Sequence, residues 1–472
     1  MEKKSAKANP AGTAALAAAT VRPALAGPAQ VLRESDGLSK LSFLVFGLGN
    51  LVNRQIVRGL IFLVIEIGYI AYMAAFGVAA MGDFFTLGTE EQGQVYNEAL
   101  GIFEYSNGDN SMLCMLYGVI TIVLTGIVIA VAYMSMKSAY CTQVRKAHGA
   151  PLPTFRDDLR SLLEENIHGM LMAFPMFGII AFTVIPLIFM ILIAFTSYDR
   201  NHQPPGNLFG WVGMANFTQL FTGGSKLAAT FWPVLGWTLI WAVAATASNF
   251  ILGMLLALLI NQKIVRGKGF WRFLFVLSIA VPQFVSLLSM RTIFNANGPV
   301  NVILRTIGVL GATESIPFFT NELTAKLTII GINIWIGVPY TMLSTTGILQ
   351  NIPTELYEAA RIDGARPPTI FRKITLPYMM FVMTPTLITS FTGNINNFNV
   401  IYLLTGGGPD SLDYYFAGKT DLLITWLYRL TITQKDYNIG SVIGIMTFVV
   451  LAITSLLTFH QTGAYKDEGA FQ

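Results

Sequence analysis

The sequence is poor in charge, cysteine and histidine. Asp, Glu, Lys and Arg make up 12% of the 472 residues, whereas soluble domains carry about 25%. The two cysteines, Cys114 and Cys141, lie far apart and match no metal or redox spacing, so we interpret them as packing residues. The four histidines form no H-E-x-x-H or similar pattern. These shortages argue against a soluble domain and predict that the chain binds no metal.

The sequence also lacks a secretory signal and a nucleotide-binding loop. Residues 1–40 are rich in Ala, Lys and Arg, without an apolar core of about 7–15 residues before a cleavage site, and we predict a disordered cytoplasmic tail. The fragment nearest to G-x-x-x-x-G-K-[ST] is Gly418-Lys419-Thr420, but Asp413 stands where the first glycine is needed. No pattern for acid–base or covalent catalysis is present, so we predict that the chain is not an enzyme.

Long apolar runs are abundant, and 53% of the residues are hydrophobic. A helix of roughly 20 apolar residues crosses the hydrocarbon core of a bilayer. The predicted fold class is therefore an all-α integral membrane protein with eight spanning helices. The glycine-interrupted stretch 41–53 is predicted as an interfacial segment before the first span. The eight runs are 57–80, 111–135, 172–196, 231–261, 270–294, 326–348, 378–404 and 438–460.

The distribution of Lys and Arg predicts how the spans are oriented, because cytoplasmic loops carry more of these residues than outer loops. With the N-terminus inside, most Lys and Arg fall on the inner side, and the predicted outer loop 81–110 has acidic residues but no Lys or Arg. An even span count then places both termini in the cytoplasm. The predicted domains are the tail, a segment with two N-terminal spans (41–164) and a six-helix core (165–465).

The segment 351–377 between the sixth and seventh runs predicts a short helix, a turn and a second helix. Pro353 suits the start of a helix, where its missing N–H costs nothing. Gly364 stands where a left-handed residue ends a helix. Pro377 then opens the seventh span. A short helix projecting from the membrane in this way suits docking into a groove of another protein.

This segment resembles the "EAA" coupling motif of binding-protein-dependent ABC importer permeases. The resemblance implies that the helix inserts into a cleft on an ATP-binding partner, so that ATP and Mg²⁺ are bound by partner subunits and this chain binds no cofactor. The matching residues are Glu358-Ala359-Ala360-x-x-Asp363-Gly364-Ala365 and Phe371-x-x-Ile374-x-Leu376-Pro377. The resemblance implies that Glu358, Ala359, Ala360, Asp363, Gly364 and Ala365 form the contact with the ATPase.

The chain from the third run onward is most similar to the larger (MalF-type) permease subunits of maltose/maltodextrin importers. Matching landmarks are Ala280-Val-Pro282, Trp335-Ile-Gly-Val-Pro339-Tyr340 and Asn396-Asn397-Phe398. The large insertion that Gram-negative members carry between spans three and four is absent, because the loop covers only about 197–230. The resemblance implies a Gram-positive plasma membrane, a smaller MalG-like permease partner, two ATP-binding subunits and a sugar-binding lipoprotein outside the cell.

Two polar helix faces are candidates for a sugar site. Asn333, Ile336, Gly337 and Tyr340 in the sixth run share one face, as do Ser390, Gly393, Asn394 and Asn397 in the seventh. At 1.5 Å per residue, Asn333 and Asn394 lie roughly 10 and 15 Å below the outer ends of their runs. Such faces either line a cavity or hold helices together by hydrogen bonds and close glycine contacts.

The resemblance favours the cavity, because the related subunit places its sugar contacts at the positions aligned with these eight residues and with Ile279 and Gln283 in the fifth run. Gly393 and Ile279 stand where the relative has aromatic residues. This difference leaves maltodextrins and galacto-oligosaccharides both open as substrates.

The predicted function is therefore that of a permease that moves oligosaccharides by alternating access in an ATP-driven importer. One alternative is an ion-coupled secondary sugar transporter, which would work without partners. Another is a membrane scaffold or receptor that transports nothing. The sequence shows no relay of buried acids for the first alternative. The one acid well inside a span, Glu66, is either a packing residue or a functional charge.

Overall fold

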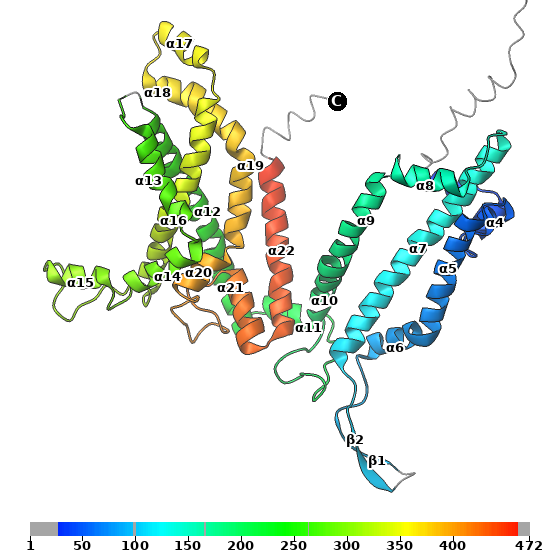
Figure 1. Cartoon of the computed structure of the whole chain (residues 1–472). Helices are drawn as coiled ribbons and strands as arrows, with labels where there is room; N and C mark the ends of the chain where they lie inside the picture. The colour runs from blue at the N-terminus through cyan, green and yellow to red at the C-terminus, as the bar shows by residue number, and fades with distance from the viewer. Residues whose placement is uncertain (1–26, 98–100, 165–166, 263, 461–472) are drawn as a thin grey trace, which may run out of the picture. The chain divides into compact units, whose positions relative to one another are not determined.

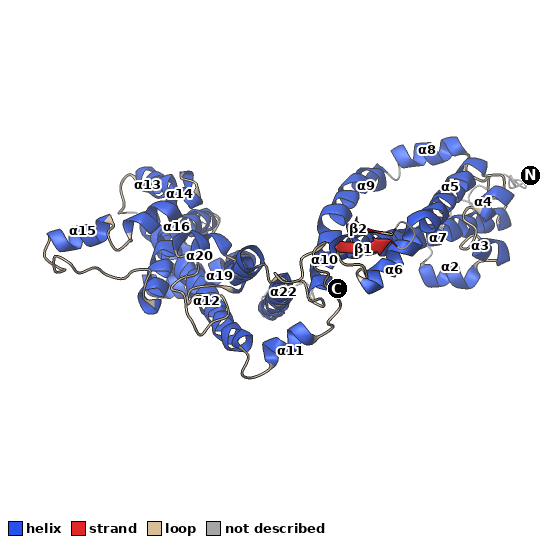
Figure 2. Cartoon of the chain, turned by 90° about the horizontal axis from the view of Figure 1, so that it is seen from below, coloured by secondary structure: helices blue, strands red, loops and turns tan. Residues whose placement is uncertain are grey.

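The computed structural model describes residues 27–97, 101–164, 167–262 and 264–460. The chain forms two compact units (Figures 1 and 2). Unit 1 contains residues up to Leu192 together with Asn201–Trp211, and unit 2 contains Ile193–Arg200 and the chain from Val212 onward. The domain boundary near residue 164 stays a prediction.

Unit 1 contains three long apolar helices and several short elements. Its spans are Ile56–Thr86, Ser111–Ala147 and Ile167–Ile193. Few of the residues in the first and third spans are buried within the protein, as expected for helices that face lipid. The elements are α2 (Pro28–Glu34), α3 (Gly37–Leu41), α4 (Leu48–Val52), α5 (Ile56–Tyr72), α6 (Val78–Thr86), β1 (Gly93–Asn97), β2 (Ile102–Ser106), α7 (Ser111–Ala147), α8 (Phe155–Leu163), α9 (Ile167–Ile179) and α10 (Ile185–Ile193). Turns of π-helix, Met73–Gly77 and Ile180–Val184, join α5 to α6 and α9 to α10.

The prediction of a disordered tail is wrong for residues 28–40, where α2 and α3 form. Val31 is fully buried against Met136 and Tyr140 of α7. The hydroxyl of Tyr140 donates to the carboxylate of Glu34 at 2.6 Å. These contacts are tertiary, so the local composition did not reveal them. The rest of the predicted tail, residues 1–26, lies outside the described residues.

The contacts of Glu66 favour the packing interpretation. Its carboxylate accepts a hydrogen bond from the backbone N–H of Phe46 at 2.8 Å. The next N–H, of Gly47, donates to Ser135 Oγ at 2.7 Å. Glu66 and Ser135 thus accept from two backbone N–H groups of the turn between α3 and α4. Without these acceptors, the two N–H groups would be unpaired against the spans.

The predicted outer loop 81–110 contains a feature that the sequence analysis missed. Strands β1 and β2 form an antiparallel hairpin that pairs Tyr96 with Phe103 and Gln94 with Tyr105. The hairpin extends from the end of α7 opposite to α8 (Figure 1). It is the one sheet among the residues that the structure describes.

Unit 2 is built around α12, α16 and α19, which pack along one another. Buried side chains of α12, α16 and α20, including Trp241, Ile329 and Val400, form one cluster of its core. The elements are α11 (Ala215–Phe221), α12 (Lys226–Asn261), α13 (Lys268–Ala280), α14 (Gln283–Ile293), α15 (Pro299–Thr306), α16 (Glu322–Gln350), α17 (Thr354–Ile362), α18 (Pro367–Ile370), α19 (Leu376–Ile395), α20 (Phe398–Leu404), α21 (Leu423–Tyr428) and α22 (Tyr437–His460). A π turn, Phe371–Thr375, joins α18 to α19, and another, Arg429–Gln434, follows α21.

The predicted fifth span is broken. Helices α13 and α14 are separated by Val281 and Pro282 and bend by 88°. Proline cannot continue the backbone hydrogen bonding of α13 and restricts the residue before it. Across the described ranges, seven helices are long and apolar enough to span a membrane, or eight if this bent pair counts as one span. The prediction of an all-α protein with about eight spans is confirmed.

The seventh span differs from its prediction at both ends. One helix runs from Pro367 to Ile395 and contains Pro377 in its interior. The π turn that precedes Pro377 accommodates the missing N–H without a break. The helix ends at Ile395, so Asn394 lies at its end and not well inside it.

A buried carboxylate organises the loop between α20 and α21. Asp421 is fully buried, accepts from the N–H of Gly418 at 2.7 Å and forms an ion pair with Arg429 at 3.1 Å. Burial raises the pKa of Asp421, and these two partners oppose that change. Gly407 has a φ of 91°, and a side chain there would collide with Asp421. This geometry explains the glycine at position 407.

Candidate functional site

A polar cavity of about 320 Å³ lies within unit 2. Nine of the ten predicted sugar-contacting residues line it. They are Gln283, Asn333, Ile336, Gly337, Tyr340, Ser390, Gly393, Asn394 and Asn397. The tenth, Ile279, does not line the cavity, because it precedes the 88° bend between α13 and α14 whereas Gln283 follows it. The role of these residues in binding stays a prediction.

The cavity forms where α16 and α19 face α12. Both helices present their polar residues at intervals of three and four, so each contributes one face. Helix α12 adds Thr246, Asn249 and Phe250, which sequence reasoning missed. The signal for them was a polar group, Thr246 to Asn249, inside a long apolar helix, which is costly unless it faces a cavity or another helix. Other lining residues that were missed are Thr341, Met383, Thr386 and Leu387.

Hydrogen bonds fix one side of the cavity. The side-chain amide of Asn394 donates to Thr246 Oγ1 at 3.0 Å, and that of Asn397 donates to Asn394 Oδ1 at 3.2 Å. Asn397 also accepts from the N–H of Val400 at 3.3 Å and so caps α20. These side chains are therefore oriented before any ligand arrives.

Two buried side-chain amide atoms of residues at the cavity have no hydrogen-bond partner in the part of the chain that the structure describes. They are Nδ2 of Asn333 and Oδ1 of Asn249. Asn333 is only 5% exposed. A buried donor or acceptor without a partner costs about 1–3 kcal/mol. Both residues line the cavity, so this unused hydrogen-bonding capacity lies in its wall.

The described cavity lining contains amides, hydroxyls, apolar groups and aromatic rings, and no charged side chain. Hydroxyl groups of a neutral ligand can bond to the amides, and a ring such as Tyr340 offers a flat apolar face. The lining thus favours a neutral, hydroxyl-rich ligand over an ion. No group of residues that could hold a metal ion occurs in the part of the chain that the structure describes.

Gly337 allows α16 to lie close to α12, and we predict that Gly337→Ala destabilises the protein. A Cβ at this position would overlap the side-chain amide of Asn249, and overpacking typically costs about 1–3 kcal/mol. The melting temperature in detergent should fall. Gly393→Ala is the matched control, because a Cβ at Gly393 meets open space. Equal melting temperatures for the two variants would contradict this account.

The predicted coupling segment forms the expected helix and turn. Helix α17 is preceded by Pro353 and followed by Asp363, and Gly364 has a left-handed φ of 76°. Glu358, Ala359, Asp363 and Gly364 are exposed, whereas Ala360 and Ala365 are half-buried. Figure 1 shows α17 projecting from the end of unit 2 at which α22 ends.

Exposed apolar residues and one hydrogen bond distinguish α17 from an ordinary loop helix. Ile362 is 86% exposed and Leu356 is 47% exposed, which leaves apolar surface without cover in this chain. The hydroxyl of Tyr357 forms a hydrogen bond of 3.1 Å with Thr375 in the π turn before α19. The helix is therefore open toward another protein and tied to a spanning helix.

A polar cavity among spanning helices, together with a projecting helix, is the arrangement of a multi-pass membrane permease. Residues 249–462 match the family described as "Binding-protein-dependent transport system inner membrane component". The chain belongs to this family.

Curated relatives extend the similarity to nearly the whole chain. The galactooligosaccharides transport system permease protein GanP of Bacillus subtilis is 34% identical over 424 residues, which are 89% of this chain and 96% of that protein. The maltodextrin transport system permease protein MalC of Streptococcus pneumoniae serotype 4 is 33% identical over 444 residues, 92% and 98% of the two chains. The maltose/maltodextrin permease MalF of Escherichia coli is 36% identical over 257 residues, 53% and 49%.

Solved structures show the same fold. A bacterial ABC transporter involved in the import of the acidic polysaccharide alginate has a TM-score of 0.52 and 22% identity, covering 64% of this chain and 96% of the other. The same kind of transporter in complex with a periplasmic protein bound to an alginate pentasaccharide has a TM-score of 0.51 and 24% identity, covering 66% and 97%.

Proposed function

We propose that this chain is the permease subunit that carries neutral oligosaccharides, of the maltodextrin or galacto-oligosaccharide type, through an ATP-driven importer. The observation that carries the proposal is the uncharged, amide-lined cavity between α12, α16 and α19. The relatives, a galactooligosaccharide permease and a maltodextrin permease, agree with a neutral sugar. A cavity without charge fits an acidic polysaccharide such as alginate poorly.

In this proposal the chain works by alternating access with partners. A smaller MalG-like permease completes the translocation path, and two ATP-binding subunits hold ATP and Mg²⁺, so that this chain binds no cofactor. Residues Glu358 to Ala365 dock into the ATP-binding subunits. A lipoprotein delivers sugar at the outer face. The protein resides in a Gram-positive plasma membrane with both termini in the cytoplasm.

The test is sugar uptake by the reconstituted complex carrying Asn333→Leu or Asn394→Leu. Each change removes hydroxyl-binding groups from the cavity, and losing one buried hydrogen bond to a substrate costs about 1–3 kcal/mol, or roughly 5- to 150-fold in transport efficiency. Thr389→Leu is the control, because Thr389 lies on α19, bonds only to its own helix and does not line the cavity.

Unchanged uptake in both asparagine variants would remove the cavity from the mechanism. Uptake by this chain alone in liposomes, driven by an ion gradient without ATP, would favour the secondary transporter instead. That alternative has no observation of its own in its favour.

A further inference from the structure

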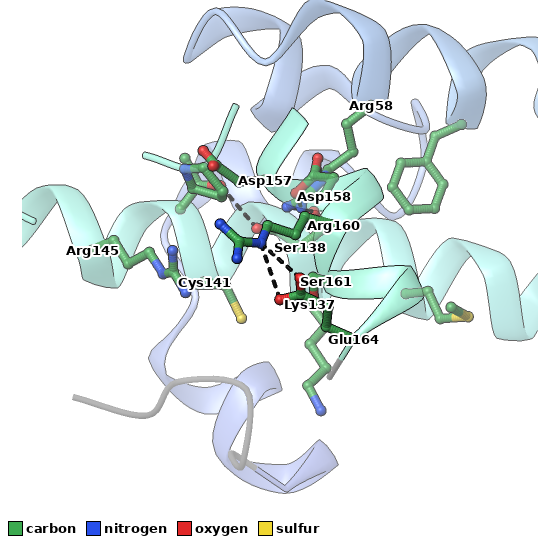
Figure 3. Close-up of a pocket in the computed structure, with 14 residues that line it drawn as sticks. Arg58, Lys137, Ser138, Cys141, Arg145, Asp157, Asp158, Arg160, Ser161 and Glu164 are labelled. Carbon is green, nitrogen blue, oxygen red and sulfur yellow. Dashed lines mark hydrogen bonds and ion pairs between the residues drawn. The ribbon is translucent and has the colours of Figure 1, made fainter. Parts of the chain in front are cut away.

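A second pocket, of about 760 Å³, lies within unit 1 and has no place in the transport mechanism above. Its walls come from α5, α7, α8 and the segment before α8. Figure 3 shows its charged side chains gathered around one hollow. Four cations, Arg58, Lys137, Arg145 and Arg160, line this pocket, which contains three acids.

The acids of the pocket are all engaged. Asp158 pairs with Arg58, and Glu164 pairs with Arg160 at 2.9 Å. Asp157 accepts two hydrogen bonds of 2.8 Å from Thr154 at the start of α8. Asp157 keeps its charge, because Thr154 is neutral, so the four cations and three acids leave the pocket with one net positive charge.

Lys137 and Arg145 are the remaining cations. Neither side chain has a hydrogen bond or ion pair among the residues that the structure describes, although both are half-buried. They lie on one face of α7, four residues either side of Cys141. Both, together with Arg58, lie within electrostatic reach of its thiol. Two half-buried, unpaired cations facing one hollow form a site for an anion.

The depth of the pocket matches the head-group layer of a bilayer. No charged residue occurs in α7 between Ser111 and Met136, a length of about 39 Å, whereas the hydrocarbon core is about 30 Å thick. Lys137 therefore lies at or beyond the edge of the core. The exposed apolar residues of α8, Phe155, Leu159 and Leu163, recur every four residues, as in a helix that lies in the membrane surface.

The pocket is also amphipathic. Phe62 of α5 and Met134 of α7 line it. Phe62 follows Arg58 by about one helical turn, and Met134 precedes Lys137 by about one turn. Both are thus on the side of the cations that faces the apolar part of the spans. Met134 is 58% exposed. A small anion from water would make no favourable contact with this apolar surface. A phospholipid would, because its acyl chains lie directly beside its phosphate.

We propose that this pocket binds an anionic phospholipid, with Lys137 and Arg145 on the phosphate-bearing head group and Phe62 and Met134 against the acyl chains. Basic pockets between spanning helices recognise anionic head groups in this way. The excess of Lys and Arg that sets membrane orientation does not account for this pocket, because it requires neither burial of the cations nor their presence around one hollow.

The test is a titration of the purified full chain in neutral detergent with phosphatidylglycerol, using the melting temperature as the readout of binding. Phosphatidylglycerol should raise the melting temperature, and phosphatidylcholine should not. In Lys137→Gln/Arg145→Gln the apparent affinity should fall roughly 30-fold, since each cation near the membrane surface contributes about 1 kcal/mol. The control is Lys146→Gln/Arg156→Gln, which removes the same charge from exposed positions of α7 and α8 outside the pocket.

Equal affinity in the two double variants would overturn the proposal. A shift of the same size with inorganic phosphate would also overturn it, because the ligand would then be an aqueous anion. If the Lys137/Arg145 variant is unfolded without lipid, the single variants and the binding of spin-labelled phosphatidylglycerol to the folded wild-type protein give the same comparison.

Discussion

Replacing Gly364 by proline should reduce ATP-dependent sugar uptake by the reconstituted complex to background. Gly364 has a φ of 76°, and proline is fixed near −65°, so the turn after α17 cannot form in the variant. The angle between α17 and the helix that begins at Pro367 would then change. ATP hydrolysis should either fall or proceed without transport, depending on whether the ATP-binding subunits still dock.

The control for this variant is Gly267→Pro. Gly267 has a φ of 68° and is the residue directly before α13. Proline at position 267 would conflict with the left-handed backbone in the same way as proline at position 364, but outside the coupling segment 351–377. Gly364→Ala gives a graded test, because a Cβ there meets nothing within 4 Å and the remaining cost is the left-handed backbone, about 1–2 kcal/mol. Normal uptake in Gly364→Pro would exclude this segment from energy coupling.

Filling the cavity at Gly393 should restrict the range of sugars. Gly393 lines the cavity, and a Cβ there meets open space, so the first atom of a side chain fits without moving the backbone. In Gly393→Phe the ring occupies part of the 320 Å³ and competes with the substrate. We expect uptake of a trisaccharide or longer sugar to fall at least tenfold, which corresponds to about 1.4 kcal/mol, and uptake of a disaccharide to fall less.

The measurement is the ratio of transport efficiencies for sugars of increasing length. Gly331→Phe serves as the control, because Gly331 is also unobstructed and on a cavity-forming helix, α16, but lines a different hollow. An equal loss for all lengths would indicate that Gly393 affects packing or movement and not the space available to substrate. No loss would show that substrate does not occupy this part of the cavity.

Most of the fold of the spans and the coupling turn was predictable, because each depends on local sequence. A long apolar run predicts a spanning helix independently of how that helix packs against its neighbours. A glycine after a short helix predicts the left-handed turn that Gly364 adopts. The two polar faces of α16 and α19 followed from helical periodicity alone, and both line the same cavity.

The features that were missed depend on direction or on distant contacts. Hydropathy at 270–294 is continuous across Pro282, so it does not report the 88° change of direction that separates Ile279 from Gln283. Burial of Val31 requires α7, which lies about a hundred residues away. Asn249 was missed because its helix carries no regular polar face, and its importance appears only beside Gly337.

The helix Pro367–Ile395, which continues through one π turn, gives the permease a mechanical property. Its 29 residues make a rod about 43 Å long, with the turn at Gly364 beyond one end and Gly393 and Asn394 at the other. A tilt of about 10° around its midpoint would displace each end by about 4 Å in opposite directions, since each arm is about 22 Å. Motion applied at the membrane surface would thus reach the cavity through one helix, in which the π turn at Phe371–Thr375 and Pro385 are the points where bending is easiest.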